Sequence, residues 1–167
     1  EILLRHLGEL RGVPRELDDY GRPISSEARG IAVLKQFLTK AGVDVSTLSL
    51  RDGSGLARQD LISPRATSQL LLFMSRHPQF AIYRESLPVP GDGTLRRRMK
   101  GTPAEGKVQA KTGSLSYVRS LSGYVTTKKG QMLIFSFMGN NYTGAGTDLT
   151  NVYDQLCALL ADYEGEL

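Results

Sequence analysis

Apolar side chains recur at helical spacing in several stretches of the chain, and capping residues mark where the helices begin and end. The first helix is predicted over residues 1–8, with Gly8 as its stop. A second helix begins at Ser25-Ser26-Glu27 and ends at Gly42. A third begins at Ser63-Pro64, a cap followed by a first-turn proline, and ends at His77-Pro78. The apolar faces that these helices should bury comprise Ile31, Leu34, Phe37, Leu38 and Ala41 in the second and Leu70, Leu71 and Met74 in the third.

Strand-like patterning dominates the last third of the chain. Residues 107–113, 118–127 and 131–138 are separated by short connections, which predicts an antiparallel meander. Met132-Leu133-Ile134-Phe135 is apolar on both faces, so we expect this strand to be covered on both sides. Residues 43–50 predict a further short strand and residues 94–99 a short helix. A closing helix begins at Asp148, and its buried stripe should comprise Leu149, Val152, Tyr153, Leu156 and Leu160.

Together these elements predict one α+β unit, with helices first, then a three-stranded antiparallel sheet and a C-terminal helix. Composition is consistent with a packed domain, since 40% of the 167 residues are hydrophobic and 23% are charged, with a net charge of +4. No stretch approaches the ~20 apolar residues of a membrane span. One cysteine and two histidines exclude a disulfide framework, a thiolate zinc site and a His-x₃-His metal pair.

Several polar features have ordinary structural interpretations. His6 and His77 are expected at helix ends as polar caps. Cys157 lies on the apolar stripe of the closing helix and is expected to be a small buried hydrophobe. The cluster Arg96-Arg97-Arg98 is short and has no interleaved aromatic residues, which favours a solvated helix face over a nucleic-acid site.

The most informative short string is Lys111-Thr112-Gly113, followed by Ser114, at the end of a predicted strand. Lysine supplies a fixed positive charge, threonine a hydroxyl, and glycine leaves room for the backbone of a ligand. Such an edge binds a carboxylate and pairs with the main chain of a ligand as an added strand. The competing interpretation is an ordinary strand end, since a given tripeptide occurs by chance in roughly 4% of chains of this length.

Three strings follow one another along the chain: Asp52-Gly53-Ser54-Gly55-Leu56-x-Arg58, then Leu87-Pro88-Val89-x-Gly91-Asp92-Gly93-Thr94-Leu95, and finally Ala110-Lys111-Thr112-Gly113-Ser114-Leu115. In this order they resemble the D-alanyl-D-alanine carboxypeptidase/endopeptidase family, the low-molecular-mass serine penicillin-binding proteins. That family also carries Ser-x-x-Lys and Ser-x-Asn elements, and neither occurs in this sequence. The resemblance therefore implies that residues 1–167 are the C-terminal part of a β-lactamase/transpeptidase-like domain whose N-terminal strands and catalytic helix are missing.

The resemblance also implies roles for individual residues. Lys111 would supply positive potential for the terminal D-alanine carboxylate of the substrate, and Thr112 would donate a hydrogen bond to it. Gly113 would keep the strand accessible to the substrate backbone. Ser114 would contribute its backbone N–H as half of the oxyanion hole. The implied reaction is serine acyl transfer on D-Ala-D-Ala stem peptides of peptidoglycan, with no metal or organic cofactor.

The implied partners are peptidoglycan peptides and β-lactams, and the implied location of the parent protein is periplasmic or otherwise outside the cytoplasmic membrane. Nucleic acid is not an expected partner, and the sequence leaves the oligomeric state open. Two alternatives stand beside this interpretation: a β-lactamase or esterase of the same fold, and a non-catalytic cell-wall-binding fragment. Because the family sheet has five antiparallel strands, we expect the strand over residues 131–138 to have an open edge or to pair with another segment or chain.

Overall fold

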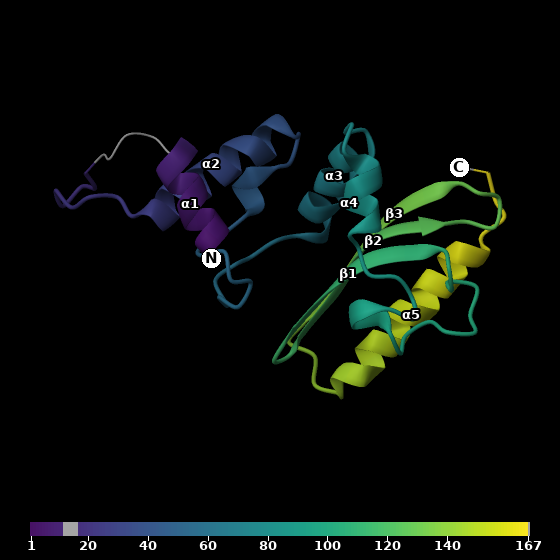
Figure 1. Cartoon of the computed structure of the whole chain (residues 1–167). Helices are drawn as coiled ribbons and strands as arrows, with labels where there is room; N and C mark the ends of the chain where they lie inside the picture. Colours follow the sequence, from purple (N-terminus) through teal and green to yellow (C-terminus); the bar gives the residue numbers. More distant parts are fainter. Residues whose placement is uncertain (12–16, 167) are drawn as a thin grey trace. The chain divides into compact units, whose positions relative to one another are not determined.

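The computed structural model describes residues 1–11 and 17–166, which group into two compact units, Glu1–Leu70 and Leu71–Leu167. The boundary falls within helix α3 (Pro64–Ser75). The first unit also contains helices α1 (Ile2–Arg11) and α2 (Ser26–Lys40), and the second contains α4 (Phe80–Glu85), β1 (Val108–Leu115), β2 (Val118–Thr126), β3 (Met132–Asn140) and α5 (Gly146–Asp162) (Figure 1).

In the first unit, α1 and α2 pack with their backbones in close approach. Gly8 lies inside α1 and is buried, so the prediction that it ends the helix is wrong. A Cβ on Gly8 would overlap the Ser26 carbonyl and lie 2.7 Å from the Gly30 nitrogen. Glycine stands here because two helices cross, not because one stops. His6 is consequently exposed in the middle of α1 and is not a helix-end cap.

The caps of α2 and α3 agree with the sequence. The Ser25 hydroxyl accepts from the Ala28 N–H at the start of α2, and the Ser63 hydroxyl accepts from the Ala66 N–H at the start of α3, each at 3.1 Å. Gly42 follows α2 at φ +77°, a left-handed conformation that favours glycine. Leu38, Val43 and Ala66 form the small buried core of this unit.

The predicted strand over residues 43–50 is wrong. Val45–Thr47 form a single 3₁₀ turn, and the Asp44 carboxylate caps it by accepting from the Ser46 N–H. Ser49 alone in this stretch makes a strand-like contact, an isolated bridge to Leu61. The β-branched content of the stretch is outweighed by the local hydrogen bonds of the aspartate, which favour a turn.

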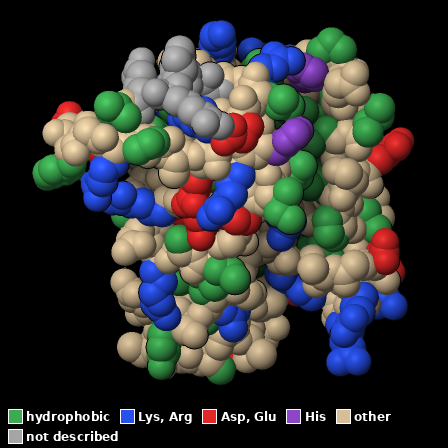
Figure 2. All heavy atoms as spheres, turned by 60° about the vertical axis from the view of Figure 1, so that its left-hand side comes forward, with side chains coloured by type: hydrophobic (Ala, Val, Ile, Leu, Met, Phe, Trp, Pro, Cys, Tyr) green, Lys and Arg blue, Asp and Glu red, His purple; other side chains and the backbone are tan. Residues whose placement is uncertain are grey.

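Ion pairs lie on the surface of the first unit. The Arg5 guanidinium of α1 lies 2.9 Å from the carboxylate of Glu1, which precedes the helix, and 3.0 Å from that of Glu27 on α2. On the face of the molecule shown in Figure 2, Lys and Arg side chains are interspersed with Asp and Glu. Exposed pairs of this kind contribute little to stability.

The three strands of the second unit form the predicted antiparallel meander, in the order β1-β2-β3. Gly113 faces Ser120 across the first pair of strands, and Gly123 faces Phe135 across the second. In the described part of the chain β3 pairs with β2 alone, in agreement with the predicted open edge. One face of the sheet packs against α5, where the core comprises Leu121, Val125, Phe135, Tyr153, Cys157 and Ala161 with their neighbours.

The buried stripe of α5 differs from the predicted one. Tyr153, Cys157 and Ala161 are buried, whereas Val152 is 47% exposed and Leu156 37% exposed. The helix is therefore rotated so that Tyr153, Cys157 and Ala161 face the sheet. Cys157 is fully buried, as predicted.

The opposite face of the sheet contacts α4, a helix that the sequence analysis missed. Tyr124 of β2 is fully buried there, and its ring meets Phe80 edge-on with centroids 5.1 Å apart. Its hydroxyl donates to the Leu71 carbonyl at 2.8 Å. On β3, Leu133 and Phe135 pack toward α5, but Met132 is 38% exposed, so the prediction that both faces of this segment are covered is only half met.

Candidate functional site

The Lys111–Ser114 segment lies at the end of β1, on an edge of the sheet. The Ala110 N–H donates to the Pro88 carbonyl at 2.9 Å, on the side of β1 that faces away from β2. Because the direction of backbone groups alternates along a strand, the N–H groups of Thr112 and Ser114 also point away from β2. Both are therefore placed to bond a ligand strand beside β1.

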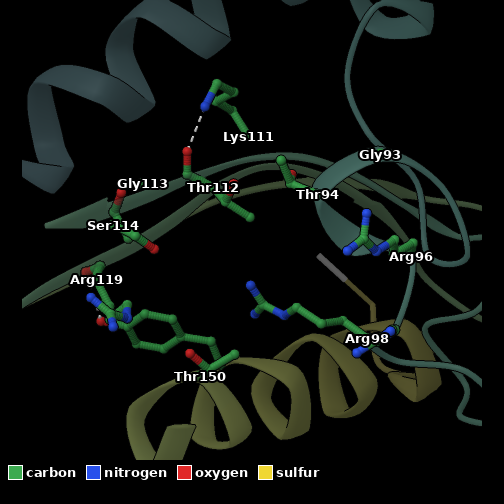
Figure 3. A pocket seen from close by; sticks show the side chains of 13 residues that line it. Gly93, Thr94, Arg96, Arg98, Lys111, Thr112, Gly113, Ser114, Arg119 and Thr150 are labelled. Atoms are coloured by element: carbon green, nitrogen blue, oxygen red, sulfur yellow. Dashed lines mark hydrogen bonds between the residues drawn. The ribbon is translucent and has the colours of Figure 1, made fainter. Parts of the chain in front are cut away.

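Lys111 is exposed and its ammonium donates to the Thr112 carbonyl at 2.6 Å (Figure 3). The Thr112 carbonyl also points away from β2 and lies between the outward N–H groups of Thr112 and Ser114. The Lys111 ammonium therefore occupies the acceptor that separates these two donors. A chain lying along this edge thus meets a run of donors and a positive charge. That combination suits an anionic ligand end.

Gly113 faces Ser120 of β2, and a Cβ on this glycine would overlap the Ser120 hydroxyl. Because Gly113 has no side chain, the Ser120 side chain of β2 fits against β1 at this position. Packing against Ser120 is thus one reason for a glycine at position 113. That the glycine also gives a ligand backbone access to β1 stays a prediction.

A hollow of about 860 Å³ opens beside this edge. Three parts of the second unit line it: the loop that precedes β1, strands β1 and β2, and α5. In Figure 3, Ser114 and Arg119 stand at one end and Arg96 and Arg98 at the other, with Thr150 of α5 below them. Its lining residues are Gly93, Thr94, Arg96, Arg97, Arg98, Lys111, Thr112, Gly113, Ser114, Arg119, Ser120, Thr150 and Tyr153.

The loop that carries the three arginines is not the predicted helix over residues 94–99. It forms a 3₁₀ turn at Gly93–Leu95, and the Asp92 carboxylate accepts from the Gly93 N–H at 2.7 Å. Leu95 and Met99 are buried and anchor the loop in the core of the unit. Met99 adopts φ +57°, a left-handed conformation that ends any helical continuation.

The interpretation of Arg96–Arg98 as a solvated face is also wrong in part. All three line the hollow, and Arg98 pairs with Asp154 of α5 at 2.7 Å, with both side chains less than one fifth exposed. This ion pair fastens the loop to the helix below the hollow. Sequence spacing gave no sign of it, because the two residues lie 56 positions apart.

Arg119 is a lining residue that the sequence analysis missed. One of its guanidinium nitrogens donates to the Leu115 carbonyl at 2.7 Å and to the Val118 carbonyl at 2.8 Å. Its guanidinium carbon lies 5.8 Å from the centre of the Tyr142 ring. Arg119 thus ties together the turn between β1 and β2, directly after Ser114.

The buried thiol of Cys157 takes no part in this site. Burial, reinforced by the nearby Asp154 carboxylate, raises the pKa of the thiol to about 12. The thiol is therefore protonated and unreactive at neutral pH. Among the described residues, no three His, Cys, Asp or Glu side chains gather as metal ligands, and no helix has the length and apolarity of a membrane span.

Two of the three sequence strings meet at the hollow. Gly93 and Thr94 of the second string and Lys111–Ser114 of the third line it together. The first string lies in the other unit, where Asp52 accepts from the Ser54 N–H at 3.0 Å and shapes a turn. The structure thus brings together the second and third strings within one unit.

Comparison with known families matches this arrangement. The family model of the D-Ala-D-Ala carboxypeptidase 3 (S13) family matches residues 12–163. The chain belongs to this family. The S13 family is one of serine-type D-Ala-D-Ala carboxypeptidases that are penicillin-binding and act on peptidoglycan.

Several S13-type relatives are similar in sequence. A D-alanyl-D-alanine carboxypeptidase of Actinomadura sp. strain R39 is 39% identical over 81% of this chain and 26% of its own length. The carboxypeptidase DacB of Haemophilus influenzae is 34% identical over 74% of this chain and 26% of its own. The chain therefore spans about a quarter of the length of these relatives.

Solved structures extend the likeness to the fold. Penicillin binding protein 4 of H. influenzae, complexed with a β-lactam, has a TM-score of 0.72 at 29% identity, over 92% of this chain and 37% of that one. The β-lactamase TLA-1 has a TM-score of 0.57 at 16% identity, over 94% of this chain and 70% of that one, which shows the fold alone. The α+β, β-lactamase/transpeptidase-like fold is thereby confirmed.

Proposed function

We propose that this chain supplies the substrate-binding strand of a serine D-Ala-D-Ala peptidase that acts on peptidoglycan stem peptides. The observation that carries the proposal is the open edge of β1, where the Thr112 and Ser114 N–H groups point outward beside the Lys111 charge. Membership of the S13 family supports the reaction class.

In the proposed complex the substrate lies along β1 as an added strand. Its terminal carboxylate is bound by the Lys111 charge and by the Thr112 hydroxyl, which lines the hollow. The Ser114 N–H bonds the scissile carbonyl oxygen and stabilises the negative charge that develops there. One missing oxyanion donor costs about 3–4 kcal/mol of transition-state stabilisation, so its alignment matters.

We propose that the nucleophile lies outside this chain, because no serine here has lysine three residues on. In the complete reaction the serine oxygen bonds the amide carbon of D-Ala-D-Ala and the amide nitrogen leaves, with a proton, as D-alanine. Water then cleaves the ester and restores the serine. The chain alone is accordingly expected to bind substrate without turning it over.

The proposed partners are stem peptides and β-lactams. A β-lactam complex is known for penicillin binding protein 4 of H. influenzae, which supports β-lactams as ligands. Because peptidoglycan lies outside the cytoplasmic membrane, the proposed location of the parent protein is the periplasm or another place outside that membrane.

Binding is tested by titrating N-acetyl-D-Ala-D-Ala into the ¹⁵N-labelled chain and following amide shifts. The Thr112 and Ser114 amides should shift, and Lys111→Ala should weaken binding severalfold, whereas Lys129→Gln, a charge change in the β2–β3 turn, should not. If neither amide shifts, the substrate-binding role is refuted, whether the peptide binds at another place on the chain or does not bind.

The position of the nucleophile is tested separately by intact mass after incubation with penicillin. The 18.3 kDa chain should gain no adduct. A covalent penicillin adduct on this species would show that a serine within the chain reacts, and the division of roles would be wrong.

A further inference from the structure

The hollow beside β1 is larger and more cationic than one carboxylate requires. Its volume of about 860 Å³ is in the upper part of the range that proteins use for drug-sized ligands. Its lining includes five cationic residues: Arg96, Arg97, Arg98, Lys111 and Arg119. All other described residues that line it are neutral. The lining is therefore positively charged well beyond Lys111, and one ligand carboxylate at Lys111 would leave most of this charge unpaired.

Three of the five cations already have partners within the protein. Arg98 is neutralised by Asp154, to which it donates three hydrogen bonds of 2.7–3.3 Å. Arg119 donates to the Leu115 and Val118 carbonyls, and Lys111 donates to the Thr112 carbonyl. Among the described residues, no acidic side chain lies within ion-pair distance of Arg96 or Arg97.

Arg96 and Arg97 are also held in place despite being exposed. They follow the capped turn at Gly93–Leu95 and precede Arg98, which is fixed to α5. On either side of them Leu95 and Met99 are buried. Two uncompensated guanidinium groups are thus carried by a backbone that is anchored at both ends.

We propose that Arg96 and Arg97 form a second carboxylate-binding subsite, for an acidic group on the leaving-group side of the scissile bond. The inference rests on the proposed function, in which Lys111–Ser114 binds the first carboxylate. In Figure 3 the arginine end of the hollow lies across from Ser114, whose N–H bonds the scissile carbonyl in that proposal. In a leaving group with two carboxylates, Lys111 would bind the first and Arg96 and Arg97 the second. The preferred substrates are therefore peptides whose C-terminal portion is dicarboxylic.

The test compares two peptides that differ in one charge, N-acetyl-D-Ala-D-Glu and N-acetyl-D-Ala-D-Gln, by calorimetry with the full chain at low salt. The acidic peptide should bind about fivefold more tightly, the upper end for an exposed ion pair. The double variant Arg96→Gln/Arg97→Gln should abolish this ratio and leave the affinity for the neutral peptide unchanged. Lys129→Gln, which removes a charge outside the hollow, should preserve it.

Two further arms separate the possible results. Lys111→Ala should lower the binding affinity of both peptides by the same factor. In 0.5 M NaCl the ratio of the two affinities should fall to near one, because salt screens exposed charges. Equal affinity for the two peptides, with Lys111 still required, would overturn the second subsite and leave the proposed function standing. Failure of both peptides to bind, or binding that ignores Lys111, would overturn the proposed function and the subsite with it.

Discussion

The ion pair between Arg98 and Asp154 offers a sharp test of how the hollow is built. Arg98 donates through two nitrogens to the Asp154 carboxylate, and the side chains are 17% and 19% exposed. Asp154→Asn would keep the size of the side chain and remove its charge. The guanidinium would then remain mostly buried without a counter-ion.

The expected loss follows from that burial. Breaking a fully buried pair by removing one partner costs about 3–5 kcal/mol. Because nearly a fifth of each side chain is in contact with water, we expect about 2 kcal/mol for Asp154→Asn and a similar loss for Arg98→Gln. For a domain of 60–100 residues, 2 kcal/mol lowers the melting temperature by roughly 10 °C.

The assay is urea unfolding of the wild type, the two single variants and the double variant, monitored by circular dichroism. If the residues act as a pair, the double variant should lose about 1–2 kcal/mol less than the sum of the single variants. Losses that add without coupling would refute the pairing. They would also remove the reason for expecting the arginine loop to be anchored on α5.

Three other perturbations have definite expected outcomes. Gly123→Ala would drive a Cβ into the β1 backbone and should cost about 3 kcal/mol in urea unfolding, whereas Gly130→Ala, in open space at φ +81°, should cost only the ~1 kcal/mol of a left-handed residue; equal losses would refute the packing argument. The Cys157 thiol, with its pKa raised to about 12, should react with a thiol reagent at pH 8 only after unfolding, and prompt labelling of the native chain would contradict its burial. Hydrogen bonds from the hydroxyl and N–H of Ser46 hold the pKa of Asp44 below its ordinary value, so this capping should stabilise the fold above about pH 4 and lose its effect as the pH falls further; a carboxyl titration by ¹³C NMR should show a smaller depression in Ser46→Ala, which loses the hydroxyl and keeps the N–H, and an unchanged titration would contradict the role of the hydroxyl.

The sequence predicted the sheet well because its signal is local. Alternation of side chains and short turns placed all three strands within two residues of their observed ends, and short-range caps placed α2 and α3. It failed where distant packing decides. Gly8 resembles a helix stop until α2 is seen against it, and the rotation of α5 depends on which side chains fit beneath the sheet.

The candidate site divides in the same way. The Lys111–Ser114 string could be proposed as a site from the sequence because its residues are adjacent in the chain and their types suggest one chemistry. Arg98 was misjudged and Arg119 overlooked because their partners lie across the fold or in backbone carbonyls, which no sequence spacing records. The hollow itself is a product of three separate segments and could be found only from the structure.

The contact between Pro88 and Ala110 also bears on why the outer edge of β1 is not paired with the loop that precedes it. The Pro88 carbonyl accepts one hydrogen bond from β1, but prolines at 88 and 90 have no N–H with which to answer. The segment around Pro88 can therefore make this one hydrogen bond to β1, but it cannot pair with β1 along its length as a fourth strand. A sequence with donors at both positions could extend this single contact, so the two prolines favour an edge of β1 that stays open beyond Ala110.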